Sequence, residues 1–149
     1  MSVVNKKVML GNNSKIYVDT SAFYALLDRS DRHHKQASAL WPTLLDDHIT
    51  LITSNYVVSE TIGLLQNRIG FKAAKIWYRD ILGVLDVWWV DAEAHERAYE
   101  LWLNLGNRRL SFIDSVSFVT MHYQQIEKAF CFKPSFVDNG FEMLSQSTI

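Results

Sequence analysis

Three acidic side chains occupy positions where a globular protein rarely needs a charge. Asp19 directly follows the apolar run KIYV (residues 15–18). Glu60 borders the apolar side of a helix predicted from YVVSETIGLL (56–65). Asp114 falls on the same predicted helix face as Phe118, which turns its carboxylate toward the core. These three carboxylates are therefore the first candidates for chemistry.

Each acid also has a simpler structural explanation. Asp19 is well placed to cap the helix that follows it. Glu60 could extend from the edge of an apolar stripe into water. Ser111 and Asp114 match the capping-box spacing, with Asp in place of Glu. If all three acids were only caps or edge residues, as in an unrelated small α/β binding protein, they would lie far apart in space.

Considered together, the three acids point to a shared cation. Each of them follows a different predicted strand, and the carboxyl ends of parallel strands are where α/β proteins bind ligands. A cluster of like charges is costly unless a cation neutralises it. Hard oxygen ligands without His or Cys suit Mg²⁺ or Mn²⁺. Such a site serves phosphoryl transfer well, because the metal activates water and stabilises oxyanion charge.

The segments that must position these acids alternate between strand and helix. Apolar, β-branched and aromatic runs predict four strands, at 15–18, 49–53, 84–90 and 128–132. Helical periodicity predicts helices between them, at 20–27, 33–45 (with Pro42 as a kink), 55–69, 71–82, 91–105 and 111–123. Asn55 and Asp91 are predicted helix caps. This alternation predicts a three-layer α/β domain around a parallel sheet.

Length and composition favour one soluble domain. The chain has 149 residues, of which 48% are hydrophobic and 21% charged, with a formal net charge of −1. Its apolar runs are shorter than the roughly 20 residues of a spanning helix, so we expect neither membrane insertion nor secretion, and a cytoplasmic location. Residues 1–14 are expected to form a flexible leader before a domain at 15–149. The single cysteine, Cys131, excludes an internal disulfide and is predicted to be a buried apolar residue.

Histidines and exposed aromatic residues are weaker signals. The histidine pair at 33–34, His95 and His122 have no acidic or cysteine partner at metal-ligand spacing, which predicts surface or packing roles. Adjacent aromatic residues at 77–78 and 88–89 point to different faces, so some aromatic surface is expected to stay exposed.

Three stretches that carry the acids resemble a known family. IYVDTSAF (16–23), TSNYVVSET (53–61) and LSFIDSVSF (110–118) look like the conserved blocks of a PIN domain, and in particular of the VapC-like ribonuclease toxins of type II toxin–antitoxin pairs. The resemblance extends over residues 15–144. It implies a three-layer αβα PIN-like fold whose central parallel sheet has four to five strands.

The resemblance also implies a function. It implies a metal-dependent endoribonuclease that hydrolyses RNA phosphodiester bonds and is the toxin of a toxin–antitoxin pair. Asp19, Glu60 and Asp114 would be both the catalytic residues and the ligands of Mg²⁺ or Mn²⁺, supported by Thr20 or Ser21. The implied partners are RNA, a small antitoxin protein and a second copy of the chain in a homodimer.

The sequence departs from the family pattern in two places. Relatives often carry an aspartate shortly before the block LSFIDSVSF, and this chain has GNRR (106–109) there. The family's last strand is usually followed by a further site aspartate, and this chain has Lys133 there, in AFCFKPSF (129–136). Asp138 follows five residues later and is not assigned to the site. The alternative function is therefore a catalytically weakened PIN-fold module that binds RNA or protein and acts as a regulator. An ammonium could take the electrostatic place of one metal ion without supplying its Lewis acidity.

Overall fold

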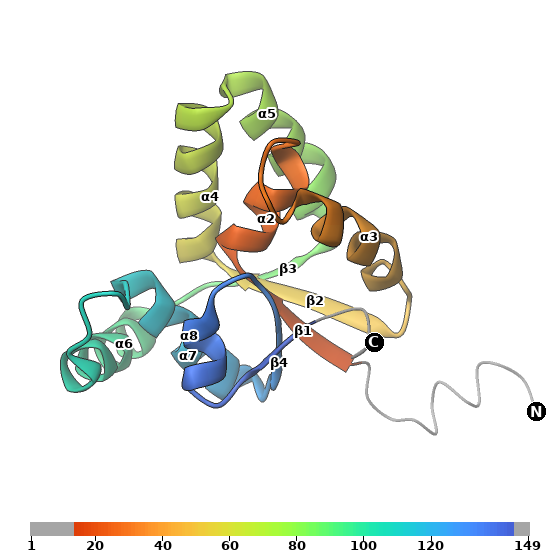
Figure 1. The fold of residues 1–149 in the computed structure, drawn as a ribbon. Coiled ribbons are helices and arrows are strands. Elements are labelled where there is room, and N and C mark those ends of the chain that lie inside the picture. The colour runs from red at the N-terminus through yellow and green to blue at the C-terminus, as the bar shows by residue number, and fades with distance from the viewer. Residues whose placement is uncertain (1–13, 145–149) are drawn as a thin grey trace, which may run out of the picture.

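A computed structural model describes residues 14–144, within which five strands form one parallel sheet (Figure 1). The predicted leader at 1–14 lies outside the described residues except for Ser14, which begins the first strand. The strand order is β3-β2-β1-β4-β5, and every neighbouring pair is parallel. The strands are β1 (Ser14–Val18), β2 (Ile49–Ser54), β3 (Asp86–Trp88), β4 (Lys128–Phe130) and β5 (Glu142–Met143).

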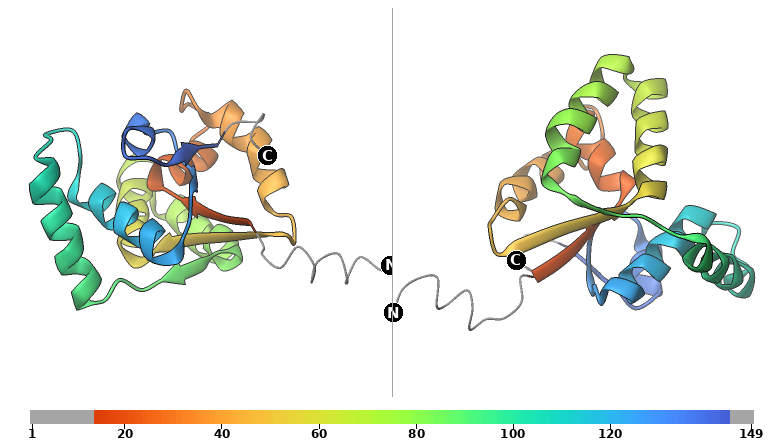
Figure 2. Two further views of the ribbon diagram at one scale, coloured as in Figure 1. Left: turned by 90° about the horizontal axis from the view of Figure 1, so that it is seen from below. Right: turned by 180° about the vertical axis from the view of Figure 1, so that it is seen from behind.

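Helices cover both faces of this sheet, which confirms the predicted three-layer αβα architecture. One layer contains α2 (Thr20–Leu27), α3 (His34–Leu44), α4 (Asn55–Arg68) and α5 (Phe71–Ile76). The opposite layer contains α6 (Ala92–Leu105) and α7 (Phe112–Gln124), while α8 (Pro134–Asp138) connects the last two strands. Figure 1 shows the two layers above and below the sheet, and the right-hand view of Figure 2 shows the same separation from behind.

The central strands are buried because helices pack on both of their sides. Tyr17, Val18 and Phe130 are completely inaccessible to solvent, and they lie on the two adjacent strands β1 and β4. The hydroxyl of Tyr17 is 2.8 Å from the hydroxyl of Ser117 on α7, so the one polar atom of this side chain is satisfied inside the core. The buried central strands therefore fix the positions of the residues that follow their carboxyl ends.

Several predicted boundaries were wrong for local reasons. Ser54, not Asn55, caps α4: its hydroxyl accepts a hydrogen bond from the backbone N–H of Val57. Asn55 is the first helical residue, and its side-chain oxygen accepts a hydrogen bond from Val90 N–H instead. The predicted helix at 71–82 is α-helical only to Ile76 and continues as a π-turn (Trp77–Ile81) and a 3₁₀-turn (Leu82–Val84).

The chain after β4 also has more structure than predicted. The strand predicted to reach residue 132 ends at Phe130, and the expected tail contains the short helix α8 and the edge strand β5. By contrast, Asp91 and Ser111 cap α6 and α7 as predicted, and Ser111 and Asp114 form a complete capping box. Pro42 lies inside α3 near its end. No helix among residues 14–144 is long and apolar enough to cross a membrane.

Candidate active site

Asp19 lies at the carboxyl end of β1, where the chain turns into α2 (Figure 1). Its side chain is fully buried, and one carboxylate oxygen, Oδ2, accepts hydrogen bonds from the backbone N–H and the hydroxyl of Ser21, at 3.0 and 2.6 Å. The other oxygen, Oδ1, is buried and has no hydrogen-bond partner. Asp19 is therefore a helix cap that also keeps an unsatisfied oxygen in the protein interior, which capping alone does not explain.

The two carboxylate oxygens of Asp114 make different contacts, one with the backbone and one with a charged side chain. Oδ2 accepts the hydrogen bond of the Ser111 backbone N–H at 3.2 Å and completes the capping box of α7. Oδ1 is 2.9 Å from the ammonium nitrogen of Lys133 and accepts a hydrogen bond from it. The side chain is only 2% exposed. The capping box expected from the sequence is thus confirmed, and it uses only Oδ2, so that Oδ1 is available to contact Lys133.

Glu60 reaches the same region from the middle of α4. Burial raises the pKa of Glu60, and so do the nearby charges of Asp19 and Asp114, while a hydrogen bond from Thr20 and the charge of Lys133 act to lower it. Its Oε1 is buried without a hydrogen-bond partner. Asp19, Glu60 and Asp114, hereafter the carboxylate cluster, therefore influence one another at one end of the sheet.

Thr20 and Ser21 hold the carboxylate cluster in place, the supporting role that the family resemblance implies for one or other of them. The hydroxyl of Thr20 is 3.0 Å from that of Thr61, and this buried contact ties the start of α2 to α4. Ser21 binds Asp19 and also accepts a hydrogen bond from the backbone N–H of Phe132 at 2.9 Å. The orientation of Asp19 is thus linked to the segment that follows β4.

Lys133, one of the two departures from the family pattern, lies among these acids. Its ammonium nitrogen is 2.9 Å from Asp114 Oδ1 and 4.0 Å from Asp19 Oδ2. Partial burial acts to lower the pKa of Lys133, but the charges of Asp19, Asp114 and Glu60 outweigh it and raise the pKa above its ordinary value. Lys133 is therefore a permanent positive charge in the carboxylate cluster.

The carboxylate cluster has the donor atoms of a hard-cation site, although its present arrangement is not closed around an ion. Oxygen donors suit Mg²⁺ or Mn²⁺. One buried oxygen of Asp19 and one of Glu60 have no hydrogen-bond partner in the protein. Among residues 14–144, however, no three His, Cys, Asp or Glu side chains are grouped so that they could hold a metal ion. Lys133 instead bridges Asp19 and Asp114. Assignment of the three acids as metal ligands remains a prediction.

Two cavities flank the carboxylate cluster, and Lys133 lines both. The first, the α2–α4 cavity, has a volume of about 400 Å³ and includes Glu60, His33 and Phe132 among its lining residues. The second, the α7–α8 cavity, measures about 500 Å³ and includes Asp114 and Asp138. Asp138, left unassigned by the sequence, is exposed and faces this second cavity. An extended ligand could thus occupy space on both sides of the cluster.

Two sequence predictions for residues near the site are confirmed, and one contact was missed. Cys131 is buried among apolar side chains, and burial raises the pKa of its thiol to about 12. His34 has a packing role, with its ring nitrogen Nδ1 2.7 Å from the carbonyl of Ala25. His33 stacks on the ring of Phe132 at the rim of the site. No local sequence signal could reveal that contact, because the two residues are far apart in the chain.

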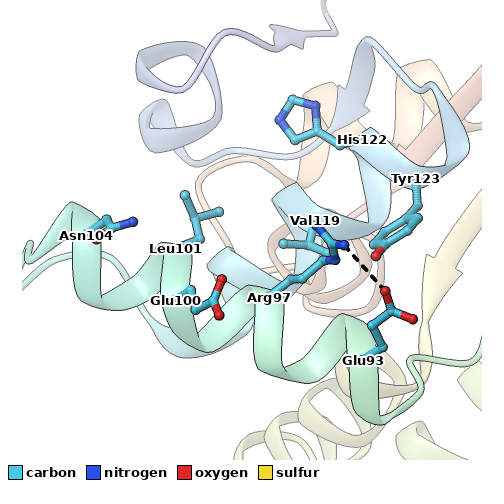
Figure 3. Close-up of a pocket in the computed structure, with 8 residues that line it drawn as sticks. All are labelled: Glu93, Arg97, Glu100, Leu101, Asn104, Val119, His122 and Tyr123. Carbon is cyan, nitrogen blue, oxygen red and sulfur yellow. Dashed lines mark hydrogen bonds and ion pairs between the residues drawn. The ribbon is translucent and has the colours of Figure 1, made fainter.

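A third cavity lies away from the carboxylate cluster, between α6 and α7 (Figure 3). This α6–α7 groove has a volume of about 620 Å³, and its wall contains the exposed ion pair of Glu93 and Arg97, at 3.4 Å. None of the three candidate acids lines it. The expected aromatic surface is confirmed at Tyr78 and Trp89, which are 55% and 73% exposed. Tyr99, Trp102 and Leu103 on α6 are exposed as well.

Comparison with known proteins identifies the family. The PIN-domain model matches residues 16–133. The chain is 35% identical over 127 residues to the 23S rRNA-specific endonuclease VapC20 of Mycobacterium tuberculosis, an alignment that covers 85% of this chain and 95% of VapC20.

Solved structures agree with this assignment. The crystal structure of M. tuberculosis VapC20, a sarcin-ricin loop cleaving toxin, superimposes with a TM-score of 0.78 at 34% identity, over 87% of this chain and 98% of that one. A VapBC2 structure from Rickettsia felis, bound to a promoter DNA fragment, is only 10% identical but has a TM-score of 0.65, over 87% of this chain and 97% of that one, and so supports the fold alone. The chain therefore belongs to the PIN-domain family and to its VapC-like ribonuclease toxins.

Proposed function

We propose that this protein is an endoribonuclease that hydrolyses RNA phosphodiester bonds with Mg²⁺ or Mn²⁺ held by Asp19, Glu60 and Asp114. The observation that carries the proposal is the pair of buried carboxylate oxygens, Asp19 Oδ1 and Glu60 Oε1, that have no hydrogen-bond partner. Unsatisfied buried acceptors are costly, and a cation is the ligand that would satisfy both at once. The similarity to VapC20, itself a 23S rRNA-specific endonuclease, supports RNA as the substrate.

The chain's own residues divide the work of the site. A bound divalent ion supplies an activated water and stabilises the charge that develops on the phosphate oxygens. Asp19 is held in one orientation by Ser21, and Asp114 by the capping box of α7, so both carboxylates are positioned before any ligand arrives. Lys133 is placed to attract the RNA phosphate, because its ammonium lies between the cluster and both flanking cavities.

A small antitoxin and a second copy of the chain are the proposed protein partners. Related PIN-fold structures include VapBC complexes, and exposed aromatic side chains on α6 offer a surface of the type enriched in protein interfaces. Co-expression with the adjacent small open reading frame, followed by purification through a tag on the toxin, tests the antitoxin. Light scattering of the toxin alone tests the dimer.

Metal dependence is the first test of the proposed function. Purified protein is incubated with single-stranded RNA in Mg²⁺ or Mn²⁺, then with excess EDTA, and then again with metal. We expect cleavage that stops on chelation and returns when metal is restored. Cleavage that persists in EDTA would contradict a metal-dependent mechanism.

Lys133 favours a second candidate function, a PIN-fold module with weakened catalysis that binds RNA or protein. Its ammonium already neutralises part of the carboxylate cluster, and this lowers the attraction of the cluster for a divalent ion. Wild-type protein that binds RNA but does not cut it at millimolar Mg²⁺ or Mn²⁺ would favour this alternative. If Lys133→Asp then restored cutting, the lysine would be identified as the cause.

A further inference from the structure

We propose that the α2–α4 cavity binds one base of a single-stranded RNA substrate, stacked against the paired rings of His33 and Phe132. The ligand class is a nucleobase next to the phosphate that lies at the carboxylate cluster. This inference rests on the proposed ribonuclease function and adds to it a place for one nucleotide of the substrate.

The first observation is the geometry of the two rings. Their centroids are 4.3 Å apart and their planes differ by only 6°, so His33 and Phe132 form a flat stacked pair. Both side chains are half-buried, and both line the cavity. Proteins commonly bind unpaired RNA bases by stacking them on aromatic side chains, since every base has a flat π-face. The ring pair therefore offers a suitable surface for a base.

The second observation is that the backbone of Phe132, which carries one of the two rings, is hydrogen-bonded through Ser21 to Asp19 of the carboxylate cluster. The backbone N–H of Phe132 donates to the Ser21 hydroxyl at 2.9 Å, and that hydroxyl donates to Asp19 Oδ2 at 2.6 Å. On the other side, the backbone N–H of His33 donates to Asp31 Oδ1 at 2.8 Å. A base held on these rings would therefore keep a fixed position relative to Asp19.

The third observation is the charge around the cavity. Its lining contains the acids Asp31 and Glu60 and three cations, Arg32, Arg68 and Lys133. The cations outnumber the acids and can neutralise the phosphates on either side of a bound base. Arg32 also donates a hydrogen bond from Nε to His33 Nε2, at 3.1 Å, so one of these cations helps to orient the stacking ring. The volume of about 400 Å³ is within the range of small-ligand pockets. Stacking surface and cations together fit a nucleotide better than an apolar peptide.

The ring of His33 is not needed to form the adjacent helix. His33 occupies the N-cap position of α3, but its side chain makes no capping hydrogen bond there. Its replacement should therefore leave the fold intact and remove only the stacking surface. This makes His33 a better probe than Phe132, which also packs against the core.

Stacking is measured with the full chain in EDTA, so that RNA is bound without being cut. A set of short single-stranded RNAs carries 2-aminopurine at one position each, and binding is followed by anisotropy and by 2-aminopurine fluorescence. We expect wild-type protein to quench the probe strongly at one position. His33→Ala should weaken RNA binding about 5- to 150-fold and abolish that quench, and His33→Phe should restore both.

The matched control is His48→Ala. His48 immediately precedes β2, at the amino ends of the strands and so at the end of the sheet away from the carboxylate cluster, and its ring contacts Asp46. This variant should therefore bind RNA and quench the probe like wild type. Equal RNA affinity and equal quenching in wild type and His33→Ala would overturn the base-binding cavity, whether or not the wild type cuts RNA. A His33-dependent quench in a protein that does not cut RNA with metal would support the cavity and count against the nuclease function.

Discussion

The carboxylate cluster and the α6–α7 groove place charge in opposite ways. In the cluster, Asp19 and Asp114 are 0% and 2% exposed, and both contact the partly buried ammonium of Lys133. In the groove, Glu93 and Arg97 form an ion pair whose side chains are 72% and 60% exposed (Figure 3). Buried charges carry a desolvation cost of several kcal/mol each, whereas exposed pairs cost and contribute little.

This difference supports the carboxylate cluster as the proposed active site. The groove has a volume of about 620 Å³, larger than the cavities of about 400 and 500 Å³ beside the cluster. The charged side chains of its ion pair are exposed to solvent, however, and pay little desolvation cost. The cluster keeps three acids close to one another and leaves two buried oxygens without partners. Such an arrangement opposes folding stability, and it is explained by a function that needs concentrated negative charge.

The largest expected effect is on stability and comes from Asp114. Asp114→Ala removes one half of the α7 capping box and leaves the Lys133 ammonium without its nearest anion. We expect a loss of about 2–4 kcal/mol in the free energy of unfolding, measured by urea denaturation. Asp114→Asn, which can keep the capping contact, should lose less. A loss equal in the two variants would show that the capping contact of the Asp114 side chain contributes nothing and that its charge accounts for the whole effect.

The hydroxyl pair of Thr20 and Thr61 should have the next largest effect. Thr20→Val leaves the buried Thr61 hydroxyl without its partner and removes the hydrogen bond to Glu60, for an expected loss of about 1–2 kcal/mol. The control is Thr120→Val, because Thr120 bonds only a carbonyl within its own helix. Similar losses in the two variants would argue against a special role for the contact between α2 and α4.

Lys133 should affect metal affinity more modestly. A unit charge at 4 Å contributes about 4 kcal/mol at an effective dielectric constant near 20, before desolvation, and even a quarter of that changes affinity about five-fold. Lys133→Met should therefore bind Mn²⁺ about five-fold more tightly in calorimetric titrations. Lys128→Met is the matched control, since Lys128 on β4 pairs with Glu142 on the edge strand β5 in an exposed contact. Unchanged affinity in Lys133→Met would show that the ammonium does not compete with the metal.

The smallest effect is expected in the groove. Glu93→Gln breaks an exposed ion pair near the start of α6 and should cost less than about 1 kcal/mol of stability, and less still at high salt. RNA cleavage should not change. A marked loss of cleavage in this variant would mean that the groove, too, takes part in substrate binding.

Features that depend on neighbouring residues could be predicted from the sequence. The Asp91 cap, the Ser111–Asp114 capping box and the alternation of strands with helices follow from local hydrogen bonding and periodicity, and all are confirmed. The PIN family, the VapC-like resemblance and the three-layer fold are confirmed as well. The three acids were chosen because each departs from the apolar pattern around it. Their catalytic and metal-binding roles stay predictions.

Features that depend on distant residues could not be predicted. The two-residue strand β5 has too little sequence to show a pattern and exists only because β4 offers it an edge. The choice of Ser54 over Asn55 as the cap of α4 depends on where β2 ends. The resemblance to the family places Lys133 beside the acids, but the oxygens that it contacts, Asp114 Oδ1 and Asp19 Oδ2, depend on how the folded chain brings distant segments together.

We propose that the carboxylate cluster, and not the α6–α7 groove, cuts RNA. The most direct measurement compares single-turnover cleavage of one RNA, in the same Mg²⁺ or Mn²⁺ buffer, by wild type, Asp19→Asn and Glu100→Gln, with circular dichroism to verify folding. Glu100 lines the groove and is exposed. We predict that Asp19→Asn loses cleavage while staying folded, and that Glu100→Gln cleaves like wild type. Cleavage by folded Asp19→Asn at the wild-type rate would contradict the claim.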